Sequence, residues 1–96
     1  MNWIHLTDIA TIDQIIKDSF DQPQVIFKHS TRCGISSMVL KQFEKQQLTN
    51  TLEVQYYLLD LLANREISNE IAQQFSVEHQ SPQAILLENK QVVESA

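Results

Sequence analysis

The chain contains a single cysteine, Cys33, in a short polar turn between an apolar segment and an amphipathic one. A thiol reacts as its thiolate, and a helix N-terminus lowers a thiol pKa through unpaired backbone N–H groups and the helix dipole. Lys28, His29 and Arg32 precede Cys33 within five residues, although the whole chain carries a net charge of -5. This local positive charge further favours the thiolate. We predict that Cys33 is a nucleophile; the alternative is a small buried residue that only fills the core.

Ser36 stands three residues after Cys33, where a Cys-x-x-Cys motif would carry its second sulfur. A hydroxyl cannot resolve a mixed disulfide, so the predicted mechanism is monothiol. Cys33 attacks a disulfide, keeps one half of it and waits for an external thiol. Ser36 either donates a hydrogen bond to the thiolate or caps its own helix. Gly34 is the only glycine, and we expect it to serve the turn that begins this helix.

Composition excludes several other functions. One cysteine and three dispersed histidines lack the paired spacing of a structural zinc site. An acidic chain without a basic stripe is not suited to nucleic acid. The first twenty residues contain no long apolar run, which predicts neither a signal peptide nor a membrane span, and hence a cytoplasmic protein. A length of 96 residues predicts a single domain over residues 1–96.

The spacing of apolar residues alternates between about two and about 3.6, which is typical of strands alternating with helices. A capping box of Thr11 and Gln14 predicts the start of a first helix, whose apolar face includes Ile12, Ile15, Ile16 and Phe20. Asn89-Lys90 predicts the turn of a final hairpin. We expect strands at 3–6, 24–29, 53–59, 84–87 and 91–94, and helices after residue 11, over 34–48 and around 67–75.

The order strand, Cys-x-x-Ser, helix, strand, helix, X-Pro, hairpin resembles the thioredoxin fold. The segments FKHSTRCGIS and HQSPQAILL resemble the YtxJ-like family of bacillithiol-system redox proteins, the monothiol bacilliredoxins, and the resemblance covers nearly the whole chain. Of the family signature Thr-Cys-Pro-Ile-Ser, this chain keeps Cys33, Ile35 and Ser36. Thr31 lies one place earlier, and Gly34 replaces proline, which adds a backbone donor and loosens the turn. The resemblance implies an α/β, thioredoxin-like fold with a central mixed sheet of four to five strands flanked by helices.

The resemblance also implies an activity. Cys33 would remove bacillithiol from protein mixed disulfides and remain S-bacillithiolated until a second thiol releases it. Bacillithiol is then a co-substrate and no cofactor is bound; the partners are S-bacillithiolated client proteins and a low-molecular-weight thiol. The implied site comprises Cys33 as catalytic residue, Arg32, Gly34, Ile35, Ser36, Lys28 and His29 as thiolate-stabilising residues, and Thr31, Ser81 and Pro82 as substrate-binding residues.

Two of these assignments carry structural expectations. Pro82 directly precedes a strand, where proline is tolerated because it opens the strand. The resemblance implies a cis peptide at Ser81-Pro82 and backbone groups there that pair with the client as a short added strand. Lys28 or Arg32 would bind the acidic malate and sugar parts of bacillithiol, or both are simply solvated charges.

The main alternative is a non-catalytic thioredoxin-like binding module with an ordinary Cys33 pKa. Because the chain stops at Ala96 without a closing helix, an apolar face of the hairpin is expected to be exposed or covered by a partner, and a homodimer is one possibility. A cysteine peroxidase or an oxyanion reductase is disfavoured because no arginine follows Cys33 until Arg65. A cysteine protease is disfavoured because the chain leaves no room for a substrate cleft.

Overall fold

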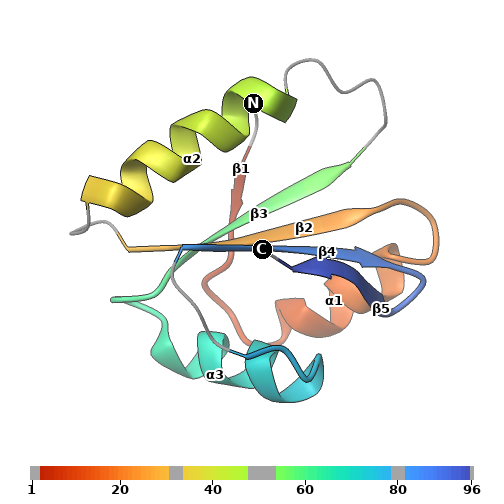
Figure 1. The fold of residues 1–96 in the computed structure, drawn as a ribbon. Coiled ribbons are helices and arrows are strands. Elements are labelled where there is room, and N and C mark those ends of the chain that lie inside the picture. The colour runs from red at the N-terminus through yellow and green to blue at the C-terminus, as the bar shows by residue number, and fades with distance from the viewer. Residues whose placement is uncertain (1–2, 31–33, 48–53, 79–81, 96) are drawn as a thin grey trace.

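Five strands form one mixed sheet between two layers of helices. The computed structural model describes residues 3–30, 34–47, 54–78 and 82–95. The elements are β1 (Trp3–His5), α1 (Thr11–Asp18), β2 (Gln24–His29), α2 (Gly34–Gln47), β3 (Gln55–Asp60), α3 (Arg65–Gln74), β4 (Gln83–Glu88) and β5 (Gln91–Ser95). The strand order is β1-β3-β2-β4-β5; the first three run parallel, and β4 is antiparallel to both of its neighbours. Helix α2 covers one face, and α1 and α3 cover the other (Figure 1).

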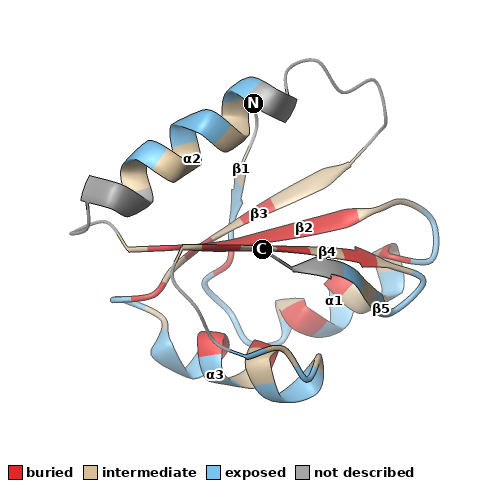
Figure 2. Cartoon of the chain, viewed as in Figure 1, coloured by how far each residue is buried: buried red, intermediate tan, exposed pale blue. Residues whose placement is uncertain are grey.

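Strand β2 is the centre of the molecule. All six of its residues are buried, because β3 and β4 flank it and helices cover both of its faces (Figure 2). Such a strand has no solvent face, so Val25, Ile26 and Phe27 follow one another without alternation, and the polar residues at the two ends of the strand are buried as well. The prediction of a buried strand at 24–29 is confirmed at both ends.

The main apolar core lies between the sheet and the α1–α3 layer. It consists of isoleucines and leucines from every element of this layer together with Tyr57. Its members are Leu6, Ile12, Ile15, Ile26, Tyr57, Leu59, Leu61, Ile67, Ile71, Ile85 and Leu87. Each such aliphatic side chain contributes roughly 1.5–3 kcal/mol when it is fully buried, so this layer supplies most of the driving force for folding.

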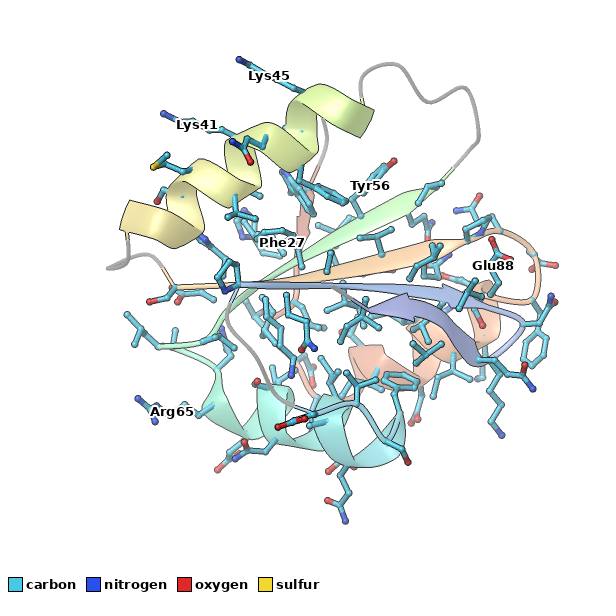
Figure 3. The ribbon with its side chains drawn as sticks, viewed as in Figure 1. Phe27, Lys41, Lys45, Tyr56, Arg65 and Glu88 are labelled. Carbon is cyan, nitrogen blue, oxygen red and sulfur yellow. The ribbon has the colours of Figure 1, made fainter. Side chains whose placement is uncertain are left out.

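Aromatic rings join α2 to the opposite face of the sheet. Phe43 on α2 lies 5.5 Å from Phe27 on β2 and 5.9 Å from Trp3 on β1, between ring centroids. Tyr56 on β3 is 5.7 Å from Trp3, and both Phe27 and Tyr56 rise from the sheet toward α2 (Figure 3). The Trp3 Nε1 donates a hydrogen bond of 3.0 Å to the Glu44 carboxylate. These contacts fix α2 on the sheet and hence fix the start of α2 at the edge of the sheet.

Helix α1 begins at Thr11 as predicted, but the predicted capping box is wrong. The N-cap position is Ala10, which offers no side-chain cap, and Gln14 Nε2 instead donates to Asp18 Oδ1 at 2.8 Å. The turn before the helix is closed by the Ala10 backbone N–H, which donates to Asp8 Oδ1 at 3.0 Å. Phe20 is also misplaced in the prediction, since the helix ends at Asp18 and the Phe20 side chain is 57% exposed.

The remaining elements lie within one or two residues of their predicted bounds wherever these are described. Helix α2 is described as far as Gln47, so its predicted end at residue 48 lies outside the described residues, and β3 runs one residue past the predicted end at Leu59. Residue 53, where the second core strand was predicted to begin, lies outside the described residues. Differences of this size are normal for element ends, so the predicted order of elements is confirmed.

The hairpin turn between β4 and β5 suggests a stabilising substitution. Asn89 and Lys90 have φ values of 52° and 68°, the combination of a two-residue type I′ turn. Lysine is unfavourable in this region, whereas glycine adopts it freely. We expect Lys90→Gly to raise the free energy of unfolding by about 0.5–1 kcal/mol in urea titrations. The control, Gln91→Gly in β5, should lower it; equal changes in both variants would contradict this account of the turn.

Candidate active site

The candidate nucleophile belongs to the connection between β2 and α2. Cys33, with Thr31 and Arg32, lies outside the described residues, as does Ser81 with the predicted cis peptide. The described surroundings are the end of β2 at His29 and the first turn of α2, which Gly34, Ile35 and Ser36 begin. No acidic residue occurs in that first turn. A cysteine directly before such a turn has its backbone N–H groups close by and no carboxylate of the same turn opposing its ionisation.

The two connections that leave neighbouring parallel strands go to opposite faces of the sheet. The chain passes from β2 to α2 on one face and from β3 to α3 on the other (Figure 1). In open α/β sheets the crevice outside the carboxyl ends of two such strands is the usual place for a ligand. The topology therefore places the Cys33 connection at the edge where binding sites normally form.

Pro82 is brought to the same edge by the antiparallel strand β4. Gln83, the first residue of β4, is the register partner of Lys28, so Pro82 lies beside the end of β2 at His29. His29 is in turn the partner of Asp60 at the end of β3. The sheet thus brings Pro82 next to the strand that leads into the Cys33 connection.

His29 lies on the face of the sheet that α2 covers. Its ring is only 6% exposed and lies 6.4 Å from the ring of Phe27, between centroids. Its backbone carbonyl accepts a hydrogen bond of 2.9 Å from the Leu61 N–H, which joins the end of β2 to the residue after β3. Of the two basic residues of β2, Lys28 and His29, it is therefore His29 that lies on the face of the sheet covered by α2, the helix that follows Cys33.

Lys28 points to the other face and is not a surface residue. Its exposed fraction is 0%, and its Nζ donates a hydrogen bond of 3.4 Å to the Ser68 carbonyl oxygen on α3. The interpretation of Lys28 as a solvated charge is wrong, and a completely buried ammonium is not available at the surface for the acidic groups of a ligand. Burial also lowers the pKa of Lys28 below its ordinary value of 10.5, because the charged form loses its hydration.

The burial of Lys28 predicts a pH-dependent difference in stability. Between the lowered pKa of the folded state and 10.5 in the unfolded state, the unfolded chain binds more protons, so the free energy of unfolding rises with pH. In Lys28→Met this contribution is absent. As pH rises toward 10.5, we expect the free energy of unfolding of the wild type to increase relative to that of Lys28→Met, by at most about 1.4 kcal/mol per pH unit.

Urea titrations of both proteins at several pH values between neutrality and pH 10 measure this gain. The raised pKa values of Tyr56 and Tyr57 affect both proteins alike, so they cancel in the difference. A difference in stability that stays constant over the whole range would show that the lysine titrates in the folded protein as it does in water.

Gln83 is a residue of this edge that the sequence analysis missed. It is 3% exposed, its Nε2 donates to the Glu78 carbonyl oxygen at 3.0 Å, and its buried Oε1 has no partner among the described residues. A glutamine directly after an X-Pro pair, in front of the apolar run Ala84–Leu87, was the only signal in the sequence. That signal does not distinguish a buried side chain from an exposed one at the beginning of a strand.

Within the described ranges, no three residues among His, Cys, Asp and Glu come together as metal ligands. No helix of the described part is both long and apolar enough to span a bilayer.

The fold and the edge of the sheet define the general class. A solved structure described as a putative oxidoreductase with a thioredoxin fold matches with a TM-score of 0.83 and 30% identity, covering 97% of this chain and 80% of that chain. Thioredoxin from Malassezia sympodialis (TM-score 0.74, 22% identity, 99% of this chain and 77% of that chain) and thioredoxin f2 from Chlamydomonas reinhardtii (0.74, 19%, 99% and 82%) share the fold. The predicted thioredoxin-like α/β fold is confirmed, and the class is that of thioredoxin-fold redox proteins.

The family follows from the sequence. Residues 4–96 match the family described as "Monothiol bacilliredoxin BrxC", so the chain belongs to this family of redox thiol proteins. The resemblance to the monothiol bacilliredoxins found in FKHSTRCGIS and HQSPQAILL is thereby confirmed.

Proposed function

We propose that this protein removes bacillithiol from protein mixed disulfides by monothiol exchange at Cys33. The Cys33 thiolate attacks the bacillithiol sulfur, and a new disulfide joins Cys33 to bacillithiol. The client sulfur leaves as a thiolate and takes a proton from water. One disulfide is broken and one is formed, so the client cysteine is reduced while Cys33 is oxidised.

The second half of the cycle uses an external thiol. The chain has no other cysteine, and Ser36 occupies the position of a second sulfur on the first turn of α2. A low-molecular-weight thiol therefore attacks the bacillithiol sulfur of the adduct and releases Cys33 as its thiolate. The product of this step is a low-molecular-weight disulfide, and the protein returns to its starting state.

One observation supports the proposal above the others. The chain belongs to the monothiol bacilliredoxin family, its only cysteine directly precedes α2 in the sequence, and the first turn of that helix contains no carboxylate. Those are the conditions under which a thiol ionises near neutral pH. His29 beneath α2 and Arg32 beside Cys33 are the groups that we assign to thiolate stabilisation.

The proposal includes the partners and the compartment. Clients are S-bacillithiolated proteins, which we expect to dock their backbone against the segment at Pro82 and against Thr31 and Ser81. A cytosolic location fits a protein whose thiol must stay reduced between cycles. A homodimer through the β4–β5 hairpin is a separate prediction. The elution volume in size-exclusion chromatography tests it.

Transfer of the adduct is the direct test. The protein is mixed with a bacillithiolated client, and intact-mass spectrometry follows both chains. We expect the mass of bacillithiol to disappear from the client and appear on Cys33, whereas Cys33→Ser leaves the client unchanged. Complex formation without transfer would favour the non-catalytic binding module, and transfer from glutathionylated but not bacillithiolated client would overturn the substrate assignment.

A further inference from the structure

Two polar side chains are buried side by side where β4 begins. Lys28 is 0% exposed and Gln83 is 3% exposed, although lysine and glutamine are rarely buried to this extent. They are register partners across β2 and β4, so their side chains lie on the same face of the sheet, toward α3. Polar groups cost free energy in such a place unless they make specific bonds, and aliphatic residues would pack there at lower cost.

The hydrogen bonds of these two side chains join β2 and β4 to α3 and to the segment that follows it. Lys28 Nζ reaches the Ser68 carbonyl oxygen at 3.4 Å and joins β2 to α3. Gln83 Nε2 reaches the Glu78 carbonyl oxygen at 3.0 Å and joins the first residue of β4 to the segment that follows α3. The Gln83 bond therefore ties the first residue of β4 to Glu78 across the connection that carries Pro82, and the Lys28 bond ties the neighbouring strand to α3, where Ser68 is 2% exposed.

The backbone at the start of β4 has an edge that is not paired with another described strand. Strand β5 pairs with β4 only from Ile85 onward, so Pro82, Gln83 and Ala84 have no strand partner on the side away from β2 within the described residues. An extended segment of another chain can add to such a backbone edge through main-chain hydrogen bonds. Binding of that kind is sensitive to the position of the edge, because every bond depends on the same rigid-body placement.

We propose that Lys28 and Gln83 are positioning residues that hold Pro82 and the first residues of β4 in the geometry that accepts the client backbone. The inference rests on the proposed function and adds two residues to it. It assigns Lys28 a role different from direct stabilisation of the thiolate, because its side chain points to α3 and not to the α2 side of the sheet. The Gln83 Oε1 is buried and has no partner among the described residues, so the bond of its Nε2 to Glu78 is the described contact that holds this side chain.

The test compares a protein client with a small disulfide. The variants are Lys28→Met and Gln83→Met, which keep side-chain length and lose the polar atoms, and the double variant. Matched controls are Lys17→Met and Gln73→Met, at exposed positions on α1 and α3. We expect each buried variant to raise KM for a bacillithiolated protein about 5- to 10-fold with kcat within about twofold. The rate with a small aromatic disulfide, and the Cys33 pKa from its pH profile, should equal those of the controls.

Because Lys28 and Gln83 are register partners at the start of β4, their effects should be less than additive in the double variant. A Cys33 pKa raised in Lys28→Met, with both substrates slowed alike, would overturn the proposal and show that Lys28 acts through its charge. An unchanged KM for the client in folded Lys28→Met and Gln83→Met would also overturn it. Far-ultraviolet circular dichroism and Trp3 fluorescence verify folding; if Lys28→Met does not fold, Gln83→Met alone decides by the same KM criterion.

Failure of the proposed function is separable from failure of this inference. A client carrying an aromatic thiol in its mixed disulfide replaces the bacillithiolated client in a second series. If the wild type attacks this client but not the bacillithiolated one, the bacillithiol assignment fails. The KM comparison in the second series then still decides whether Lys28 and Gln83 position the docking edge.

Discussion

Replacing Ser36 by cysteine is expected to release the bacillithiol adduct without an external thiol. Residue 36 belongs to the first turn of α2 and stands three positions after Cys33 in the sequence, where a Cys-x-x-Cys motif carries its second sulfur. An attacking thiol held in this place acts at an effective concentration far above that of any free thiol. At about 1 mM external thiol, the lifetime of the adduct should shorten by roughly 10²- to 10⁴-fold. Rapid-quench mass spectrometry of the Cys33 adduct measures this lifetime.

Ser37→Cys is the matched control for that experiment. Residue 37 is the next residue of the same helix, and its side chain is half-buried. The side chain of residue 37 leaves the helix about 100° further round the axis than that of residue 36, so a sulfur at residue 37 does not take the position of the second sulfur. The adduct in Ser37→Cys should last as long as in the wild type. Equal lifetimes in the two variants would show that residue 36 does not occupy the resolving position. The serine at residue 36 would then not be the reason that the protein needs an external thiol.

The buried strand and the hairpin could be predicted from local patterns alone. Residues 24–29 form a short run with β-branched and aromatic side chains after Pro23, and such a run favours a strand over a helix. Asn89 is among the residues that tolerate a positive φ, and the two apolar runs on either side of it have matching lengths. In both segments the local preference and the tertiary environment agree, and therefore the predictions are confirmed.

The side to which Lys28 points could not be predicted in the same way. Alternation along a strand places Lys28 and His29 on opposite faces, but it does not reveal that both faces are covered. The sequence near Cys33 made Lys28 a basic neighbour of the thiol, whereas the register with β4 and the bond to Ser68 make it part of the α3 layer. Gln83 was missed for the same reason, because burial at a strand end depends on elements distant in sequence.

The prediction of a capping box was wrong because two different side-chain groups can satisfy the backbone at this helix start. Thr11 and Gln14 have the required spacing, yet the Asp8 carboxylate binds the Ala10 N–H and closes the turn one residue earlier. Gln14 is then free to bond Asp18 one turn on. The type and the approximate start of the helix were predictable, whereas the choice of capping group depended on the turn that precedes it.

The aromatic contact between α2 and β2 predicts a large loss of stability in Phe27→Ala. The Phe27 side chain is 1% exposed and meets both Trp3 and Phe43, at 6.0 Å and 5.5 Å between ring centroids. Removing a buried phenylalanine ring costs about 3–5 kcal/mol through lost transfer free energy and the cavity that remains. A chain of this length has a total of roughly 5–15 kcal/mol, so the loss is a large share. Urea unfolding followed by circular dichroism measures it.

The same substitution should also affect the reaction, since Phe27 supports the helix whose first turn follows Cys33. We expect Phe27→Ala to react more slowly with client and small disulfide alike, unlike Lys28→Met, because a loosened α2 holds its N-terminal N–H groups less rigidly toward the thiolate. Val93→Ala, at a 57% exposed position on β5, is the control and should change the free energy of unfolding by less than about 0.5 kcal/mol. A loss in Phe27→Ala no larger than in this control would mean that α2 is held to the sheet by other contacts, such as the bond from Trp3 to Glu44.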